Sequence, residues 1–391
     1  KISPPLKSLF SGGGGVYNGI VHNKIGDFMR KIRRKREKRK KRIIIISVFL
    51  FLIIMTSGYA AFSTNITLHA KGNIKEKSRV IQSWTSVSQT DFHSDYYKQN
   101  IVSATFMDNN NVPDSAVESW NVSEDKENGE VMAWVVPTAS DNSKYDLYIG
   151  AKAGVIANEN SRNLFDSFYN IKSIVFNDNF DTSNATTMQS MFRRCVNLIE
   201  LDLSSFDTSN VTDMVGMFQS DDADNSMKIQ RIILGENFNT SKVTNMRAMF
   251  GNCYSLVDVD VSGFDTRNVT NMRDMFASCF ALPKVDVSNF DTSKVTNMQG
   301  MFYRCRSLTE LDISNFDTSN VTNMRSMFSE LNFDKLDLCS FDTRKVVDMN
   351  GIFSGTNLQS IYVGPNWTTE NADITHMFYN SSVSSVTTGQ C

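Results

Sequence analysis

The residues best placed to do chemistry in this chain of 391 residues are aspartates that recur at a fixed spacing. One column holds the residue between the two inward-facing apolar positions of each predicted strand, which points to the predicted concave face. Its members are Asp202, Asp260, Asp286, Asp312 and Asp337, with Ile233 interrupting the column and Tyr362 ending it. Stacked carboxylates repel one another, so the column is either a solvated face or a stripe that binds basic protein surface or weakly held Ca²⁺. We take the five aspartates and Tyr362 as binding candidates.

A second acidic column has a structural interpretation. It comprises Asp181, Asp207, Asp265, Asp291, Asp317 and Asp342, with Asn239 in the gap. Carboxylates after a strand commonly accept hydrogen bonds from nearby backbone N–H groups, so we expect this column to cap turns. A separate acidic run, residues 221–225, lacks the later Gly and Glu of an EF-hand, and we expect a solvated loop.

Catalytic and metal-binding patterns are missing from the sequence. It contains four histidines and neither a Gly-x-Ser-x-Gly nor a His-Glu-x-x-His motif. One repeated position holds Cys195, Cys253, Cys279 and Cys305. We expect small buried thiols there rather than a Cu(I) site, because the neighbouring methionines already have packing positions. Cys339 and Cys391 have no evident partner. We therefore predict no enzyme activity, no cofactor and no metal.

The elements that position these residues come from an internal repeat. The motif F-D-T or F-N-T recurs at Phe180, Phe206, Phe238, Phe264, Phe290, Phe316 and Phe341, with spacings of 26, 32, 26, 26, 26 and 25. In each unit, L-x-x-L-x-L predicts a short strand with alternate residues inward. The following M-x-x-M-F-x-x-C places apolar residues at i, i+3, i+4 and i+7, which predicts a two-turn helix. The threonine before it, such as Thr270, is the expected N-cap.

Neither element buries its apolar side alone, so the units must stack. We predict an α/β solenoid for residues 161–391, a right-handed leucine-rich-repeat-like stack of short parallel strands and short helices with a phenylalanine spine. The expected strand centres are Leu201, Ile233, Val259, Val285, Leu311, Leu336 and Ile361. Residues 80–160 are expected to form an N-terminal α+β cap, with strands at 101–106 and 131–136.

The repeat resembles the 26-residue repeat of BspA-like leucine-rich-repeat surface proteins. The motif F-D-T-S-N-V-T-N-M at 316–324, followed by Met327 and Phe328, carries the resemblance, as do the segments at 120–123 and 145–158. The resemblance spans roughly 80–391. It implies an extracellular, cell-surface, protein-interacting role, often adhesion, and it supplies no catalytic residues.

The start of the chain has a different character. Arg30–Arg42 holds eleven Lys or Arg and one acid, whereas residues 63–391 sum to −14, which excludes a uniformly basic nucleic-acid binder. Ile43–Phe62 is uncharged and long enough to span a bilayer, with the basic block on its cytoplasmic side. It is an uncleaved anchor or a signal peptide cut after Ala60. We interpret 1–28 as upstream sequence before a start at Met29, 29–62 as the leader, and 63–79 as a tether.

Two functions fit these features. The first is a bacterial cell-surface or secreted module that binds an extracellular or host protein through its concave face, as an adhesin does. The second is a structural component that self-associates in an extracellular matrix. Neither involves nucleic acid, and the membrane contact falls in Ile43–Phe62.

Overall fold

The computed structural model describes residues 77–84, 90–220 and 227–388, all within one compact unit of the chain, Ile74–Cys391. The predicted segments 1–28 and 29–62 and most of the tether lie outside the described residues. So does the apolar stretch Ile43–Phe62. Among the residues that are described, no helix combines the length and apolarity needed to cross a membrane.

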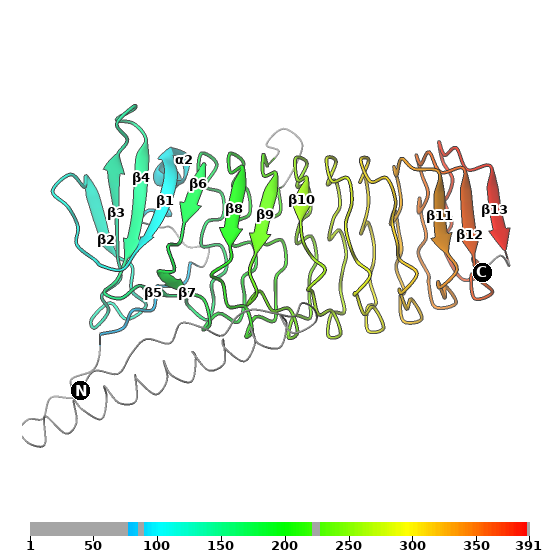
Figure 1. Ribbon diagram of the computed structural model, residues 1–391, viewed down its shortest axis with the longest axis horizontal. Helices are drawn as coiled ribbons and strands as arrows, with labels where there is room; N and C mark the ends of the chain where they lie inside the picture. Colours follow the sequence, from blue (N-terminus) through cyan, green and yellow to red (C-terminus); the bar gives the residue numbers. More distant parts are fainter. Residues whose placement is uncertain (1–76, 85–89, 221–226, 389–391) are drawn as a thin grey trace, which may run out of the picture. The chain divides into compact units, whose positions relative to one another are not determined.

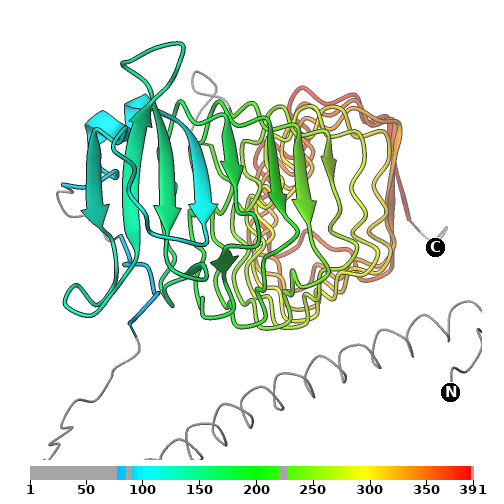
Figure 2. The same cartoon turned by 60° about the vertical axis from the view of Figure 1, so that its left-hand side comes forward.

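One helix and four strands come first among the described elements, and the four strands form a sheet to which the first repeat adds one strand (Figures 1 and 2). They are α2 Asp95–Asn100, β1 Ile101–Met107, β2 Glu118–Asn121, β3 Met132–Pro137 and β4 Tyr145–Gly150. Strands β2, β3 and β4 pair antiparallel, while β1 pairs parallel with β4 and with β6, Ser173–Val175. The strands predicted at 101–106 and 131–136 are therefore confirmed. Strand β6 belongs to the first repeat. Its pairing with β1 covers one edge of the repeat stack.

The later strands form two three-stranded parallel sheets, with one strand from each repeat that has a strand (Figure 1). They are β8 Glu200–Leu203, β9 Arg231–Leu234, β10 Asp258–Val259, β11 Lys335–Leu338, β12 Ser360–Val363 and β13 Ser385–Thr388; a separate pair joins β5 Val155–Ile156 to β7 Phe180–Asp181. The register pairs Leu201 with Ile232, so the predicted centre at Ile233 is one residue too far. Val285 and Leu311, also predicted centres, lie in backbone that forms no regular strand.

The predicted helices at the M-x-x-M-F motifs are wrong. Within the described ranges α2 is the only α-helix, and the motifs fold as consecutive tight turns. At Met272–Cys279, the Met275 N–H bonds to the Met272 carbonyl at 3.2 Å, and the Cys279 N–H to the Phe276 carbonyl at 3.2 Å. The third residue of each turn, Asp274 or Ser278, has a φ of 57° or 60°, a left-handed conformation that no α-helix contains.

The other N–H groups of Met272–Cys279 explain why this segment forms turns and not a helix. The N–H groups of Asp274, Phe276 and Ser278 bond to carbonyls of Gln299, Met301 and Tyr303 in the next repeat, at 2.8, 3.0 and 2.6 Å. Alternate groups thus close turns within a repeat or join two repeats. Two such turns return apolar side chains to the core at the same i, i+3, i+4, i+7 spacing as a helix, so the sequence pattern does not separate them.

The threonine of each F-D-T or F-N-T motif joins two repeats through its hydroxyl, a role that the sequence analysis did not predict. Thr240 Oγ1 donates to the Asp265 carbonyl at 3.0 Å and accepts from the Asp265 N–H at 2.8 Å. The equivalent threonines of the other motifs are at most 1% exposed: Thr182, Thr208, Thr266, Thr292, Thr318 and Thr343. The expected N-cap Thr270 instead donates its hydroxyl to the Thr244 carbonyl of the preceding repeat at 3.2 Å, because no helix follows it.

Aromatic side chains form two columns, which are buried in the core except for the last ring, Phe378. The predicted spine is present as stacked pairs, with Phe264 at 5.9 Å from Phe238 and 6.4 Å from Phe290. A longer column, which we did not predict, runs through the phenylalanines of the turns. Its members are Phe165, Phe192, Phe218, Phe250, Phe276, Phe302, Phe328, Phe353 and Phe378, stacked at 5.4 to 6.4 Å between ring centroids.

The cysteine column lies beside these rings. Cys195, Cys253, Cys279 and Cys305 are free and fully buried, which confirms the expected thiols. Each Sγ donates to a phenylalanine carbonyl of a preceding repeat, such as Cys305 to Phe276 at 3.1 Å. Burial raises the pKa of each thiol, to about 12 at Cys305, so these groups stay neutral and unreactive. Cys339, for which we identified no partner, is disulfide-bonded.

One buried histidine sits where the first sheet meets the repeats. His93 is 2% exposed and stacks on Trp84 with ring centroids 4.3 Å apart. Its Nε2 lies 2.8 Å from the carbonyl of Leu164, the bond of a donating ring N–H. Burial, followed by the charge of Lys98, lowers the pKa of His93 well below 6.5, and the Leu164 bond only partly opposes this.

Packing of the turn segments makes a first prediction. Met275 is fully buried, so Met275→Asp places an unpaired carboxylate in the core and should lower the free energy of unfolding by roughly 3–5 kcal/mol. Met275→Leu keeps the volume and should cost less than about 1.5 kcal/mol. Urea unfolding of both variants measures the difference. Equal midpoints would show that Met275 faces solvent.

His93 makes a second prediction, on acid stability. Because its folded-state pKa lies below 6.5, the unfolded chain binds the extra proton first as the pH falls. The free energy of unfolding should therefore be highest above about pH 6.5 and decrease below it. The variant His93→Phe loses the hydrogen bond to Leu164 and should therefore be less stable than the parent protein at neutral pH. Its urea unfolding midpoint, however, should change less with pH. Urea unfolding of both proteins near pH 7.5 and pH 5 tests this. The same change in midpoint between the two pH values in both proteins would refute the prediction.

Candidate binding surface

The first aspartate column lies on the solvent side of the strands, which we call the strand face. Asp202, Asp260, Asp286, Asp312 and Asp337 are all exposed, and Tyr362 is half-buried. The strand register places Asp202 beside Ile233, and Asp337 beside Tyr362, as the sequence predicted. Alternation along each strand turns the flanking residues, such as Val259 and Val261, into the core. The same alternation holds the aspartates outward.

Each of these carboxylates is held by its own backbone. Asp260 Oδ1 accepts the Ser262 hydroxyl at 2.6 Å and the Ser262 N–H at 3.0 Å. Asp286 and Asp312 bond in the same way to the serines two residues on, and the Asp202 and Asp337 carboxylates accept an N–H at 2.9 and 2.8 Å. One carboxylate oxygen is thereby used in a turn, while the side chain stays exposed. The direction of each carboxylate is fixed before any partner arrives.

These bonds compete with the repulsion between neighbouring aspartates. The hydroxyl and N–H of Ser262 lower the pKa of Asp260, and the corresponding serines do the same for Asp286 and Asp312. The negative charge of Asp286 opposes this by raising the pKa of Asp260 and of Asp312. The three charges are thus close enough to interact, and hydrogen bonding keeps them ionised.

A second column on the strand face was missed in the sequence. Two residues before each aspartate and before Ile233, and therefore on the same face, stand Glu200, Arg231, Asp258, Lys284, Glu310 and Lys335. Their charges alternate in sign, and Arg231 Nε bonds to Asp258 Oδ2 at 3.0 Å. Reading every second strand position would have found this column. Its three negative and three positive charges cancel, so the net negative charge of the strand face comes from the aspartate column.

A groove follows the middle of the strand face. Its volume is about 860 Å³, and Asp260, Asp286, Asp312 and Asp337 lie along it, with Tyr362 among the lining residues. Lys284, Lys335 and Glu310 also line it, whereas Asp202 does not. The groove spans the repeats at Val285 and Leu311, where the backbone forms no regular strand. The structure therefore gathers five of the six sequence candidates into one groove.

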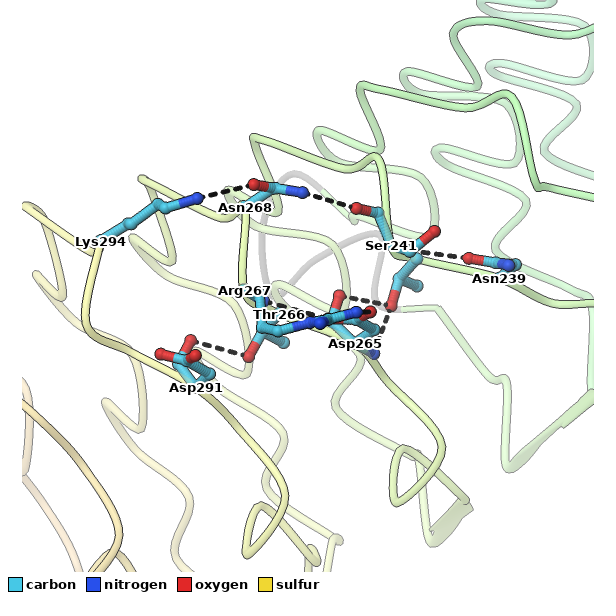
Figure 3. A network of polar contacts seen from close by, with 9 residues as sticks. Asn239, Ser241, Asp265, Thr266, Arg267, Asn268, Asp291 and Lys294 are labelled. Atoms are coloured by element: carbon cyan, nitrogen blue, oxygen red, sulfur yellow. Dashed lines mark hydrogen bonds and ion pairs between the residues drawn. The ribbon is translucent and has the colours of Figure 1, made fainter.

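The second aspartate column serves the turns. Asp265 Oδ1 accepts the Arg267 N–H at 3.2 Å and its Nε at 2.9 Å (Figure 3). The same backbone bond to residue i+2 is made by Asp181, Asp207, Asn239, Asp291, Asp317 and Asp342. The capping role predicted for this column is confirmed.

Polar side chains beside these turns reach across to the neighbouring repeat. Asn268 Nδ2 donates to the Ser241 carbonyl at 2.8 Å, and Lys294 Nζ donates to Asn268 Oδ1 at 2.8 Å (Figure 3). Asparagine and lysine thus complete a chain of bonds across three repeats.

Clustered carboxylates are potential ligands of a metal ion. The described ranges contain no group of three or more His, Cys, Asp or Glu side chains arranged to hold a metal ion. The acidic run at 221–225, predicted as a solvated loop, lies outside them.

Comparison with known proteins identifies the repeat region. The model of a family described as "Mycoplasma protein of unknown function, DUF285" matches residues 159–285, 220–311 and 283–388. These overlapping matches cover the repeats described above and more than half of the chain. No curated protein and no solved structure matches the sequence. On the strength of the family match, the chain belongs to the DUF285 repeat family.

Proposed function

We propose that this protein is a cell-surface or secreted repeat protein of the BspA-like type, and that its strand face binds another protein, as in adhesion. In this proposal the stacked repeats are a leucine-rich-repeat-like solenoid in which turns take the place of helices. The partner is an extracellular or host protein with a basic surface. No catalytic step is part of the proposal.

The exposed aspartate column is the observation that carries this proposal. Carboxylates in the interior of a strand face are costly when they stand side by side, since like charges there destabilise the fold. The repeats nevertheless place Asp260, Asp286 and Asp312 in neighbouring positions, each oriented by a serine. Parallel strands are ~4.8 Å apart, so the column presents charges at close, regular intervals.

The charge of the groove indicates the chemistry of the partner. Six acidic residues line it, Asp258, Asp260, Asp286, Glu310, Asp312 and Asp337, against two lysines, Lys284 and Lys335. A surface with this excess attracts a basic partner and speeds its encounter at low salt. Tyr362 adds an aromatic side chain to the same groove, a residue type that is enriched in protein interfaces.

Rigidity also favours binding at this face. Backbone N–H bonds orient the aspartates of the groove, and threonine hydroxyl bonds join neighbouring repeats. A preorganised surface loses less conformational entropy when a partner docks than a mobile one does.

Replacing the central aspartates tests the proposal. The triple variant Asp260→Asn, Asp286→Asn and Asp312→Asn keeps an oxygen that can accept the turn N–H, so the fold should remain intact or become slightly firmer. Binding should weaken by roughly tenfold at low salt, and its salt dependence should flatten. Surface plasmon resonance against a panel of extracellular proteins, with oligolysine as a simple basic probe, measures both.

A control variant carries the same change in net charge elsewhere. Asp114→Asn, Asp178→Asn and Glu236→Gln alter exposed carboxylates outside the groove. Their binding should match that of the parent protein. An equal loss of affinity in both variants would show that net charge, and not the groove, causes the effect. Unchanged affinity in the groove variant at low salt would refute the proposed site, and sedimentation of the free protein as large assemblies would favour the self-associating matrix component.

A further inference from the structure

A second hollow lies on the turn segments and shares no lining residue with the strand-face groove. We call it the turn hollow; its volume is about 460 Å³. Tyrosine rings stand at two of its borders, Tyr303 in one repeat and Tyr379 three repeats further on. Three steps of ~4.8 Å separate their backbones by roughly 14 Å.

The hollow exists because side-chain size changes along two columns of the turns. Between Tyr303 and Tyr379, the same column holds Ser329 and Ser354. In the neighbouring left-handed column Gly300, Ser326 and Gly351 lie between the larger Asp274 and His376. Small residues in the middle repeats and large ones at the borders give a recess with defined ends.

The rings at both ends are held in place by contacts within the protein. The Arg304 guanidinium lies over the Tyr303 ring, 4.8 Å from its centroid, and Arg304 Nε bonds to Glu330 at 2.8 Å. The Tyr379 ring packs edge-on against His376, with centroids 5.5 Å apart. Both rings are therefore oriented by the protein itself, and an aromatic ring offers apolar surface to a ligand.

The charges that line the turn hollow are compensated locally. Asp274 bonds to Arg273 at 2.9 Å, and Glu330 pairs with both Arg304 and Arg306. An ionic ligand would have to displace these pairs. Neutral ligands face no such cost, so the hollow differs in chemistry from the acidic groove on the strand face.

Several polar groups of the hollow are left for a ligand. The Gln299 side-chain amide, the Ser326 hydroxyl and the Tyr303 phenol line it and make no hydrogen bond to any described residue. An amide both donates and accepts, and hydroxyls do the same. A ligand that fits must offer hydroxyl groups at its rim and apolar patches on its faces.

We propose that the turn hollow binds a short neutral oligosaccharide. A sugar ring has an apolar face that packs on a tyrosine ring and hydroxyls that pair with amide and hydroxyl side chains. The distance between Tyr303 and Tyr379 suits a chain of several rings rather than one. A proline-rich peptide also uses aromatic grooves, but it would leave most of the polar groups of the recess unpaired.

Calorimetric titration of the full chain with chitotetraose, cellotetraose and maltotetraose tests this proposal. At least one of these sugars should bind with a dissociation constant in the millimolar range or lower. Tyr303→Ala should weaken it by about three- to tenfold, since ring stacking is lost. Ser326 lines the hollow and already carries a side chain at a φ of 54°. The variant Ser326→Leu places a larger side chain in the hollow and should abolish binding.

Gln299→Ala and Gln189→Ala make a matched pair in the same column, one inside the hollow and one outside it. Only the first should weaken binding, and thermal melts should show all variants folded. Absence of binding by all three probes would overturn the proposal. Binding that survives Ser326→Leu would place the sugar elsewhere and overturn it equally, as would preferential binding of a proline-rich peptide. None of these results bears on the aspartate groove.

Discussion

The whole repeat stack depends on how the turn segments satisfy their backbone N–H groups. A buried N–H without a partner is costly, and an isolated turn satisfies only some of its own. Alternate groups therefore bond to the next repeat, as Phe276 does to Met301 at 3.0 Å. This requires left-handed backbone at two positions per turn segment, taken by residues such as Asp274 and Ser278. Non-glycine residues pay for that conformation, and the inter-repeat bonds offset the cost.

Strict parallel register has a chemical consequence, because every residue type lies beside its own copy. For phenylalanine, cysteine and threonine this is favourable, giving stacked rings, buried thiols and shared hydroxyl bonds. For aspartate it is unfavourable unless another group compensates. Serine and backbone N–H groups do so at Asp260, leaving a charged yet ordered column on the strand face.

Spacing alone predicted the repeat, the buried apolar positions of its motif and both aspartate columns, although the strand centre expected at Ile233 is one residue too far. Spacing misassigned the secondary structure at Met272–Cys279, since paired turns and a short helix bring the same positions to the core. The buried role of Thr266 was invisible because its partners lie a repeat away. The turn hollow depends on side-chain size along columns such as that of Ser329 and Ser354, which appears only once the repeats are aligned in space.

Scalar coupling across hydrogen bonds tests the central claim most directly. In a protein labelled with ¹⁵N and ¹³C, the amide nitrogen of Phe276 should couple to the carbonyl carbon of Met301 in the next repeat. The amide nitrogen of Met275 should couple to the carbonyl carbon of Met272. An α-helix would instead couple Phe276 to the carbonyl of Met272, four residues earlier. Observation of that coupling would contradict the stack of turns on which the rest of the structure depends.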